Sequence, residues 1–242
     1  MKIIAHRGAS FYAPENTFSA FNLAFKMGAD GIEMDVRLSK DGEIVVIHDE
    51  TTGRTGNKSL TVSEALYSQL EKVDVGSYFD REFKGEKIPR LRDVMVAFPD
   101  KELYIEIKTG KEIIPYFLSL SREILFSKNF LFFSFDFEVV KTLKRFFPEN
   151  RVLFVVDYGY NVPDREGVCA AIALAVKGAS LDGVSTCADL RHGKKAAEVF
   201  KSAGLFWNVW TVDNPYLAKE FKALGVDSIS TNRPDLIAAY VK

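Results

Sequence analysis

Residues 2–38, KIIAHRGASFYAPENTFSAFNLAFKMGADGIEMDVRL, have the pattern of a strand, a helix and a second strand in succession. An apolar run leads up to His6, and Phe18, Phe21 and Phe25 then follow at helical spacing. Gly28 stands where this helix should end, and residues 31–38 alternate with the period of a strand. Such a unit predicts two parallel strands in one sheet.

The same pattern continues along the chain. We predict strands at 2–6, 31–38, 103–107, 130–134, 151–155, 181–185, 206–210 and 226–230, with helices between them. The last helix should begin at Pro234, with Asn232 placed to cap it. An open, doubly wound sheet has the same local pattern. Eight strands in 242 residues favour the α/β class and a closed (β/α)8 (TIM) barrel.

One segment, about residues 43–92, is too long for a single strand–helix connection. It contains a strand-like run at 44–47, a polar stretch at 51–59, a short helix pattern at 62–70 and a charged loop at 78–89. We expect an insertion after strand two, on the loop face of the barrel. No linker, repeat or low-complexity tract divides the chain, which predicts a single TIM-barrel domain over residues 1–242.

Composition and charge exclude several classes of protein. The chain is 47% apolar, with 32 Lys and Arg against 33 Asp and Glu, so its net charge is -1. It is therefore globular and lacks the basic excess of proteins that bind nucleic acids or anionic membranes. Cys169 and Cys187 have no metal or redox spacing, and Cys169 should be buried. Without a signal peptide or an apolar run of ~20 residues, we expect a cytoplasmic protein with no membrane span.

Acidic residues occur where strands of a barrel should open into its mouth. Glu33 and Asp35 are two residues apart and point to one side of their strand, and Glu106 ends the third strand. Taken alone, Glu33 and Asp35 could form ordinary ion pairs at a strand edge. Three carboxylates in one mouth, however, repel each other and are costly to desolvate. A divalent cation removes that cost, and an oxygen-only set favours Mg2+ or Ca2+ over Zn2+, with Mn2+ as a further candidate.

Two histidines and two cations accompany these carboxylates. His6 and His48 each follow an apolar strand, and beside a metal they can act as general acid and general base. Arg7 and Lys108 supply fixed positive charge that suits a phosphate. Together these residues predict phosphoryl chemistry. His192 lies in a polar helix start, where we expect it to be solvated.

Motifs for other chemistries are absent from the sequence. It contains no Walker loop, dinucleotide fingerprint, His-Glu-x-x-His or Gly-x-Ser-x-Gly. Trp210 ends a strand and precedes polar Thr211, which favours a place in the substrate pocket over one in the barrel filling. Tyr78, Phe79 and Phe83 of the insertion either contact the substrate or only pack on the surface, and the sequence does not choose between these roles.

At these residues the sequence resembles the glycerophosphodiester phosphodiesterase family. The matching stretches are HRGA (6–9), APENT (13–17), GADGIEMDV (28–36), KDG (40–42), VVIHD (45–49), IPRL (88–91), EIK (106–108), WTVD (210–213) and TNRP (231–234). The match is only rough at TTGRTG (51–56), where the family continues with an Arg-Thr-Thr-type run and a Gly-rich turn, and residues 111–179 match only as a pattern.

The resemblance implies a TIM barrel with a small insertion, a divalent cation, and hydrolysis of glycerophosphodiesters to glycerol 3-phosphate and an alcohol. By motif match the metal ligands are Glu33, Asp35 and Glu106, the acid/base pair is His6 and His48, and the phosphate-binding residues are Arg7 and Lys108. We expect the glycerol 2-hydroxyl to attack phosphorus and form a cyclic phosphate, which water then opens. The partner is a small-molecule substrate, whereas the head group and the oligomeric state are not defined.

Three alternatives stay open at this point. One is a phospholipase D-like cut on the same barrel, against which the lack of a disulfide framework counts. A second is a broad-specificity metal phosphodiesterase. The third is a barrel that binds phosphodiesters without turnover, against which the complete set of ligands and histidines counts.

Overall fold

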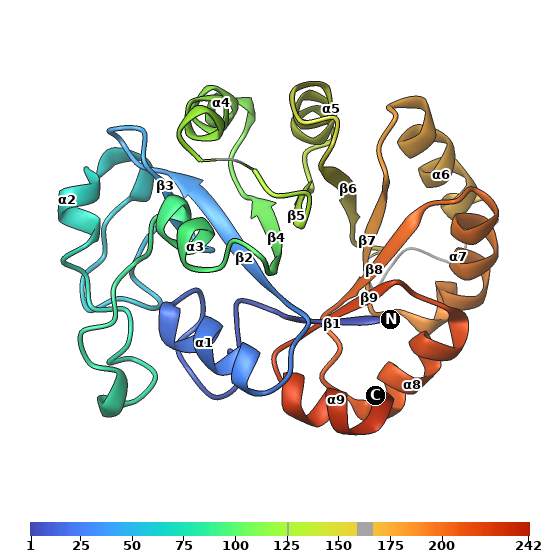
Figure 1. Ribbon diagram of the computed structural model, residues 1–242, viewed down its shortest axis with the longest axis horizontal. Helices are drawn as coiled ribbons and strands as arrows, with labels where there is room; N and C mark the ends of the chain where they lie inside the picture. The colour runs from blue at the N-terminus through green and yellow to red at the C-terminus, as the bar shows by residue number, and fades with distance from the viewer. Residues whose placement is uncertain (125, 159–166) are drawn as a thin grey trace.

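The computed structural model describes residues 1–124, 126–158 and 167–242. Within them eight parallel strands form a closed barrel, and helices cover its outside (Figure 1). The order around the sheet is β1-β9-β8-β7-β6-β5-β4-β2, and pairing of β1 with β2 closes the ring. The predicted TIM barrel is confirmed.

The strands lie close to their predicted positions. They are β1 (Lys2–Ala5), β2 (Gly31–Leu38), β4 (Glu102–Ile107), β5 (Phe130–Ser134), β6 (Arg151–Val156), β7 (Gly183–Cys187), β8 (Phe206–Trp210) and β9 (Ser228–Thr231). The helices on the barrel are α1 (Phe18–Lys26), α3 (Leu91–Ala97), α4 (Ile114–Glu123), α5 (Phe137–Phe146), α6 (Val168–Gly178), α7 (Leu190–Ser202), α8 (Pro215–Leu224) and α9 (Pro234–Val241).

Helix boundaries follow local chemistry at most of the predicted places. Thr17 caps α1 through its side chain, which accepts from the Ala20 N–H, and Gly28 takes a positive φ just after the helix. Gly225 likewise ends α8 in the left-handed region. The predicted cap of α9 is wrong. Arg233 precedes Pro234 without a capping side chain, because the Asn232 amide is bonded elsewhere, to His6 and Asp213.

Alternation along the strands sorts side chains between the barrel interior and the helices. Ile32, Met34 and Val36 of β2 belong to the apolar layer between strands and helices, whereas the intervening Glu33 and Asp35 are buried on the opposite side. A smaller apolar cluster fills part of the interior and consists of Ile4, Tyr104, Leu131, Phe133, Leu153 and Val155. The interior side of β2 is thus acidic, whereas β5 and β6 contribute apolar side chains to the interior.

Three loop aspartates brace strands at the end of the barrel opposite the site. Asp30, Asp182 and Asp227 each stand in the loop before a strand, and each accepts a hydrogen bond from a backbone N–H of another strand, that of Ile3, Val152 and Trp207 respectively. Their own N–H groups donate to the carbonyls of the same three residues. Because Asp182 and Asp227 are used in this way, β7 and β9 begin two residues later than predicted.

The segment after β2 forms an insertion outside the ring of helices, beside α1 (Figure 1). Its strand β3 (Ile44–Val46) pairs antiparallel with β2. The predicted helix at 62–70 is two short pieces, η1 (Val62–Glu64) and α2 (Tyr67–Leu70), because the chain is extended at Ala65 and Leu66. A third short piece, η2 (Arg81–Phe83), follows. The insertion has its own apolar cluster, built on Val45, Ile47, Val62, Ala65, Leu70, Val73, Val75 and Ile88.

Two further expectations concern burial. Cys169 is buried on α6, as predicted. The expectation for His192 is wrong, because its ring is buried and stacks on Tyr158 with ring centroids 4.4 Å apart. Crossing a membrane takes ~20 apolar residues in one helix, and none of the helices among the described residues meets that requirement.

The loop aspartates generate a stability prediction. Asp227→Ala removes the acceptor that lies 2.8 Å from the Trp207 N–H, and it should lower the free energy of unfolding by about 1–2 kcal/mol. Asp227→Asn keeps an acceptor oxygen and should lose less. Urea denaturation of the two variants measures this difference, and equal stability of wild type and Asp227→Ala would contradict it.

Candidate active site

Three buried carboxylates meet in the barrel mouth. Parallel pairing of β2 with β4 places Asp35 opposite Glu106, and Glu33 lies two residues before Asp35 on the same side. One oxygen from each of the three side chains lies within 4.8 Å of the others. The three predicted metal ligands are therefore brought together.

The two predicted phosphate-binding cations line this acidic cluster. Lys108 Nζ lies 2.5 Å from Glu106 Oε1 and 3.2 Å from Asp35 Oδ1. Arg7 Nε lies 3.0 Å from Asp35 Oδ2, and the Arg7 backbone N–H donates to Glu33 Oε2 at 2.8 Å. Two cations thus face three carboxylates, which leaves one negative charge in excess.

The pKa values of the carboxyl groups reflect this imbalance. Burial raises the pKa of Glu33 and of Glu106, and the charge of Asp35 raises both further. Burial acts on Asp35 too, but Arg7 and Lys108 outweigh it and hold the pKa of Asp35 below its usual value. Glu33 and Glu106 therefore resist ionisation until positive charge is added next to them.

The donor set fits a hard divalent cation. Glu33 Oε1 is buried and has no hydrogen-bond partner among the described residues, a costly state for a carboxylate oxygen. A cation between the three side chains would satisfy this atom and the excess charge together. Oxygen ligands of this kind suit Mg2+, Ca2+ or Mn2+.

His6 directs one ring nitrogen at the acidic cluster. Its Nδ1 lies 2.8 Å from Asn232 Oδ1, and the Asn232 amide nitrogen donates to Asp213 at 2.6 Å. Because the Asp213 carboxylate only accepts, it fixes the amide orientation, and His6 Nδ1 must carry the proton. Nε2 then faces Glu33, 4.0 Å from its Oε2. Burial and the charge of Arg7 lower the pKa of His6, which favours a neutral ring.

His48 reaches the same cluster from the insertion. Antiparallel pairing of β3 returns the chain toward Asp35, whose carbonyl accepts from the Ile47 N–H, and His48 follows directly. His48 Nδ1 lies 2.7 Å from Asp49 Oδ1, so this ring also holds its proton on Nδ1 and leaves Nε2 for chemistry. Burial lowers the pKa of His48.

Three residues of the site have no chemical pattern in the sequence that predicts their role. Asn16 is buried with a φ of 59°, and its amide donates to Asp35 Oδ2 at 2.9 Å. Asn232 and Asp213 orient His6, as described above. The side chains of Asn16 and Asn232 are neutral amides, so no pattern of charge in the sequence predicts their role. The signal that contained all three was the resemblance, because they lie in the quoted stretches APENT, WTVD and TNRP.

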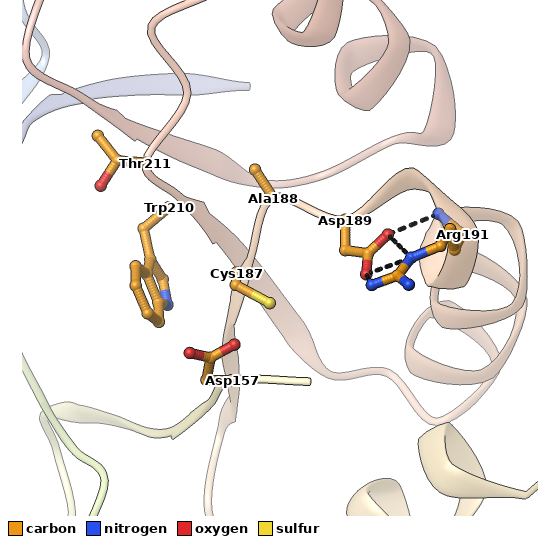
Figure 2. Close-up of a pocket in the computed structure, with 7 residues that line it drawn as sticks. All are labelled: Asp157, Cys187, Ala188, Asp189, Arg191, Trp210 and Thr211. Atoms are coloured by element: carbon orange, nitrogen blue, oxygen red, sulfur yellow. Dashed lines mark hydrogen bonds and ion pairs between the residues drawn. The ribbon is translucent and has the colours of Figure 1, made fainter. Parts of the chain in front are cut away.

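Trp210 lines a pocket of about 450 Å³ formed at the ends of β6, β7 and β8. Figure 2 shows its indole on the same side as Asp157, with Asp189 and Arg191 joined to each other on the other side. Phe135 packs edge-on against Trp210, with ring centroids 5.8 Å apart, and Lys108 Nζ lies 5.7 Å from the Phe135 centroid. Phe135 thus connects the pocket-lining Trp210 to Lys108.

The aromatic residues of the insertion lie on its surface. Tyr78 and Phe79 are 42% and 36% exposed, and Phe79 contacts Phe83 edge-on. Burial raises the pKa of Tyr78, and the charge of Glu15, in the loop that follows β1, raises it further. Tyr78 therefore lies near the loop that holds Arg7 and Asn16.

The chain is similar to known proteins along nearly its whole length. Residues 6–236 match the model of the glycerophosphoryl diester phosphodiesterase family. The Bacillus subtilis protein YhdW is 36% identical over 98% of this chain and 96% of its own length. A crystal structure of glycerophosphodiester phosphodiesterase from Agrobacterium tumefaciens has a TM-score of 0.83 at 32% identity, covering 99% of both chains. An Oleispira antarctica phosphodiesterase in complex with the product sn-glycerol-3-phosphate has a TM-score of 0.86 at 24% identity, covering 100% of this chain and 96% of that one.

The unpaired charge of the acidic cluster generates a metal-binding prediction. Adding Mg2+, Ca2+ or Mn2+ to EDTA-treated protein should raise the melting temperature, by roughly 5–10 °C at a hundredfold excess over the dissociation constant. Glu106→Gln should lose most of this increase, because it removes one ligand. Glu64→Gln, which changes an exposed acidic residue of the insertion, serves as the control. Differential scanning calorimetry measures the shift, and an equal increase in both variants would contradict the assignment.

Proposed function

The chain belongs to the glycerophosphoryl diester phosphodiesterase family and is an enzyme of that class, and from this premise we propose how its residues carry out the reaction. The proposed reaction is cation-dependent hydrolysis of a glycerophosphodiester to glycerol 3-phosphate and an alcohol. The Oleispira antarctica relative with its bound product supports a small molecule of this kind as the ligand.

One observation carries the proposal. His6 and His48, which come from different segments, each hold a proton on Nδ1 and leave Nε2 for proton transfer. The charge of Asp35 acts on both rings, and Arg7 and Lys108 pair with that same carboxylate. Phosphodiester cleavage requires one of these imidazoles to be neutral, as the base, and the other to carry a second proton on Nε2, as the acid.

Glu33, Asp35 and Glu106 are the residues that would hold the cation. When bound there, a divalent cation supplies Lewis-acid stabilisation of charge on the phosphoryl oxygens. Arg7 and Lys108, which face the same carboxylates, would interact with the substrate phosphate and offset negative charge that develops on it. The phosphate is thereby held by fixed positive charge in a buried site.

The proton transfers follow from the two imidazoles. In the first stage one histidine takes the proton of the glycerol 2-hydroxyl at Nε2 as that oxygen attacks phosphorus. The bond from phosphorus to the alcohol oxygen breaks, and the other histidine, which enters this stage as the imidazolium, donates its Nε2 proton to the departing alcohol. In the second stage water attacks the cyclic phosphate with the two roles reversed, and the bond to the 2-oxygen breaks. The product is glycerol 3-phosphate.

We assign the pocket beside Trp210 to the substrate as well. Its contact with Phe135, and the contact of Phe135 with Lys108, place an aromatic surface next to a phosphate-binding side chain. A substrate group attached to that phosphate can lie on this surface. That residues 1–242 form one domain, and that the protein works in the cytoplasm, stay predictions from the sequence.

The acid/base assignment predicts the effect of losing either imidazole. His6→Ala and His48→Ala should each lower kcat by about 10²–10⁴-fold, equivalent to roughly 3–5 kcal/mol of barrier. Release of glycerol 3-phosphate from glycerophosphocholine with added Mg2+, Ca2+ or Mn2+ measures this. His192→Gln is the matched control, since His192 belongs to α7 and its ring stacks on Tyr158. Wild-type turnover in either alanine variant would refute the assignment.

The cyclic intermediate generates a separate prediction. Bis(p-nitrophenyl) phosphate has no hydroxyl next to its phosphate, so it cannot form the cyclic ester. We expect its turnover to be at least ~10³-fold slower than that of glycerophosphocholine, because the intramolecular nucleophile is lost. Comparable rates on the two compounds, measured with the same enzyme and cation, would exclude the two-stage route and favour direct attack by water.

A further inference from the structure

Arg54, in the insertion, joins two carboxylates that belong to different parts of the barrel mouth. Its Nε lies 2.6 Å from Oδ2 of Asp49, a residue that follows β3 and is next to His48. Its Nη1 and Nη2 donate to Glu15 at 2.8 and 2.7 Å, in the loop that follows β1. All three nitrogens of one guanidinium group therefore have a carboxylate partner.

Each of these carboxylates also contacts one of the reacting side chains. The second oxygen of Asp49 bonds to His48 Nδ1 at 2.7 Å. Glu15 Oε1 accepts from Arg7 Nη1 at 3.0 Å. The five side chains form a row that begins at Arg7 and ends at His48, with Arg54 in the middle. Positive and negative charges alternate along it from Arg7 to Asp49.

We infer that Arg54 is a positioning residue for the reaction, which sets the orientation of His48 through Asp49 and that of Arg7 through Glu15. This inference rests on the proposed function of His48 and Arg7. It gives the insertion a part in catalysis that neither its apolar cluster nor its exposed aromatic residues provide.

The geometry explains why an arginine is required. Asp49 uses one oxygen for His48 and the other for Arg54, so the guanidinium group fixes the plane of the carboxylate and with it the plane of the imidazole. Glu15 is held by two parallel N–H groups, an arrangement that a lysine cannot reproduce with a single nitrogen while also reaching Asp49.

A purely structural role makes a different prediction. The Arg54 side chain is 47% exposed, and ion pairs at exposed sites add little to stability. Removing Arg54 should then lower the melting temperature by no more than about 4 °C. If Arg54 only stabilised the surface, activity would stay close to that of the wild type.

The first test compares Arg54→Ala and Arg54→Lys with the wild type on glycerophosphocholine. Arg90→Ala is the matched control, because Arg90 is another partly exposed arginine of the insertion and pairs bidentately with Asp93. We expect Arg54→Ala to lower kcat by about 10- to 100-fold, more than it changes KM, and Arg54→Lys to recover little. Added guanidinium ion should raise kcat of Arg54→Ala, whereas ammonium ion should not. Arg90→Ala should keep wild-type kcat.

The second test does not need turnover. Histidine-selective NMR of the wild type should show a His48 Nδ1–H signal, identified by its loss in His48→Ala, and Arg54→Ala should broaden or shift it while Arg90→Ala leaves it unchanged. If the wild type and Arg90→Ala release no glycerol 3-phosphate, the proposed function fails, and this spectrum alone decides the role of Arg54. An unchanged His48 signal in Arg54→Ala, or a wild-type kcat in that variant, overturns the inference.

Discussion

Burial of Asp35 in the barrel interior is the constraint around which the site is assembled. A carboxylate with no exposed surface needs partners on every side, and these come from two segments. Arg7 and Asn16 belong to the loop between β1 and α1, and Lys108 follows β4. Two of these three residues, Arg7 and Lys108, are also the ones that the proposed reaction uses to hold a phosphate.

Structural features that repeat at a fixed period along the chain could be predicted from the sequence. Alternation along β2 and β4 correctly assigned Glu33, Asp35 and Glu106 to the interior, because side-chain direction in a strand depends only on residue parity. Side-chain contacts between residues far apart in the sequence could not be predicted. Asn232 has the position of a helix cap, yet its amide bonds to His6, and His192 stands among charged neighbours, yet Tyr158 covers it. Local composition contains no information on contacts made across the barrel.

The two histidines are oriented in the same way by partners of very different origin. His48 is held by the residue that follows it in the chain, whereas the partner of His6 lies 226 positions away. Both arrangements place the proton on Nδ1 and leave Nε2 for chemistry. Two rings in the same tautomer can exchange the roles of acid and base between stages, which a cyclic intermediate requires.

Closure of the barrel joins the first strand to the last, since β1 lies between β2 and β9. The three carboxylates, both histidines and both phosphate-binding cations are present in the chain by residue 108. The amide that orients His6 belongs to Asn232, which a ribosome adds 124 residues after Lys108 (232 − 108). A growing chain therefore contains every reacting group for many seconds, at ~5–20 residues per second, before it can orient one of them. Assembly of the active site is thus completed only after the seam between β1 and β9 has formed.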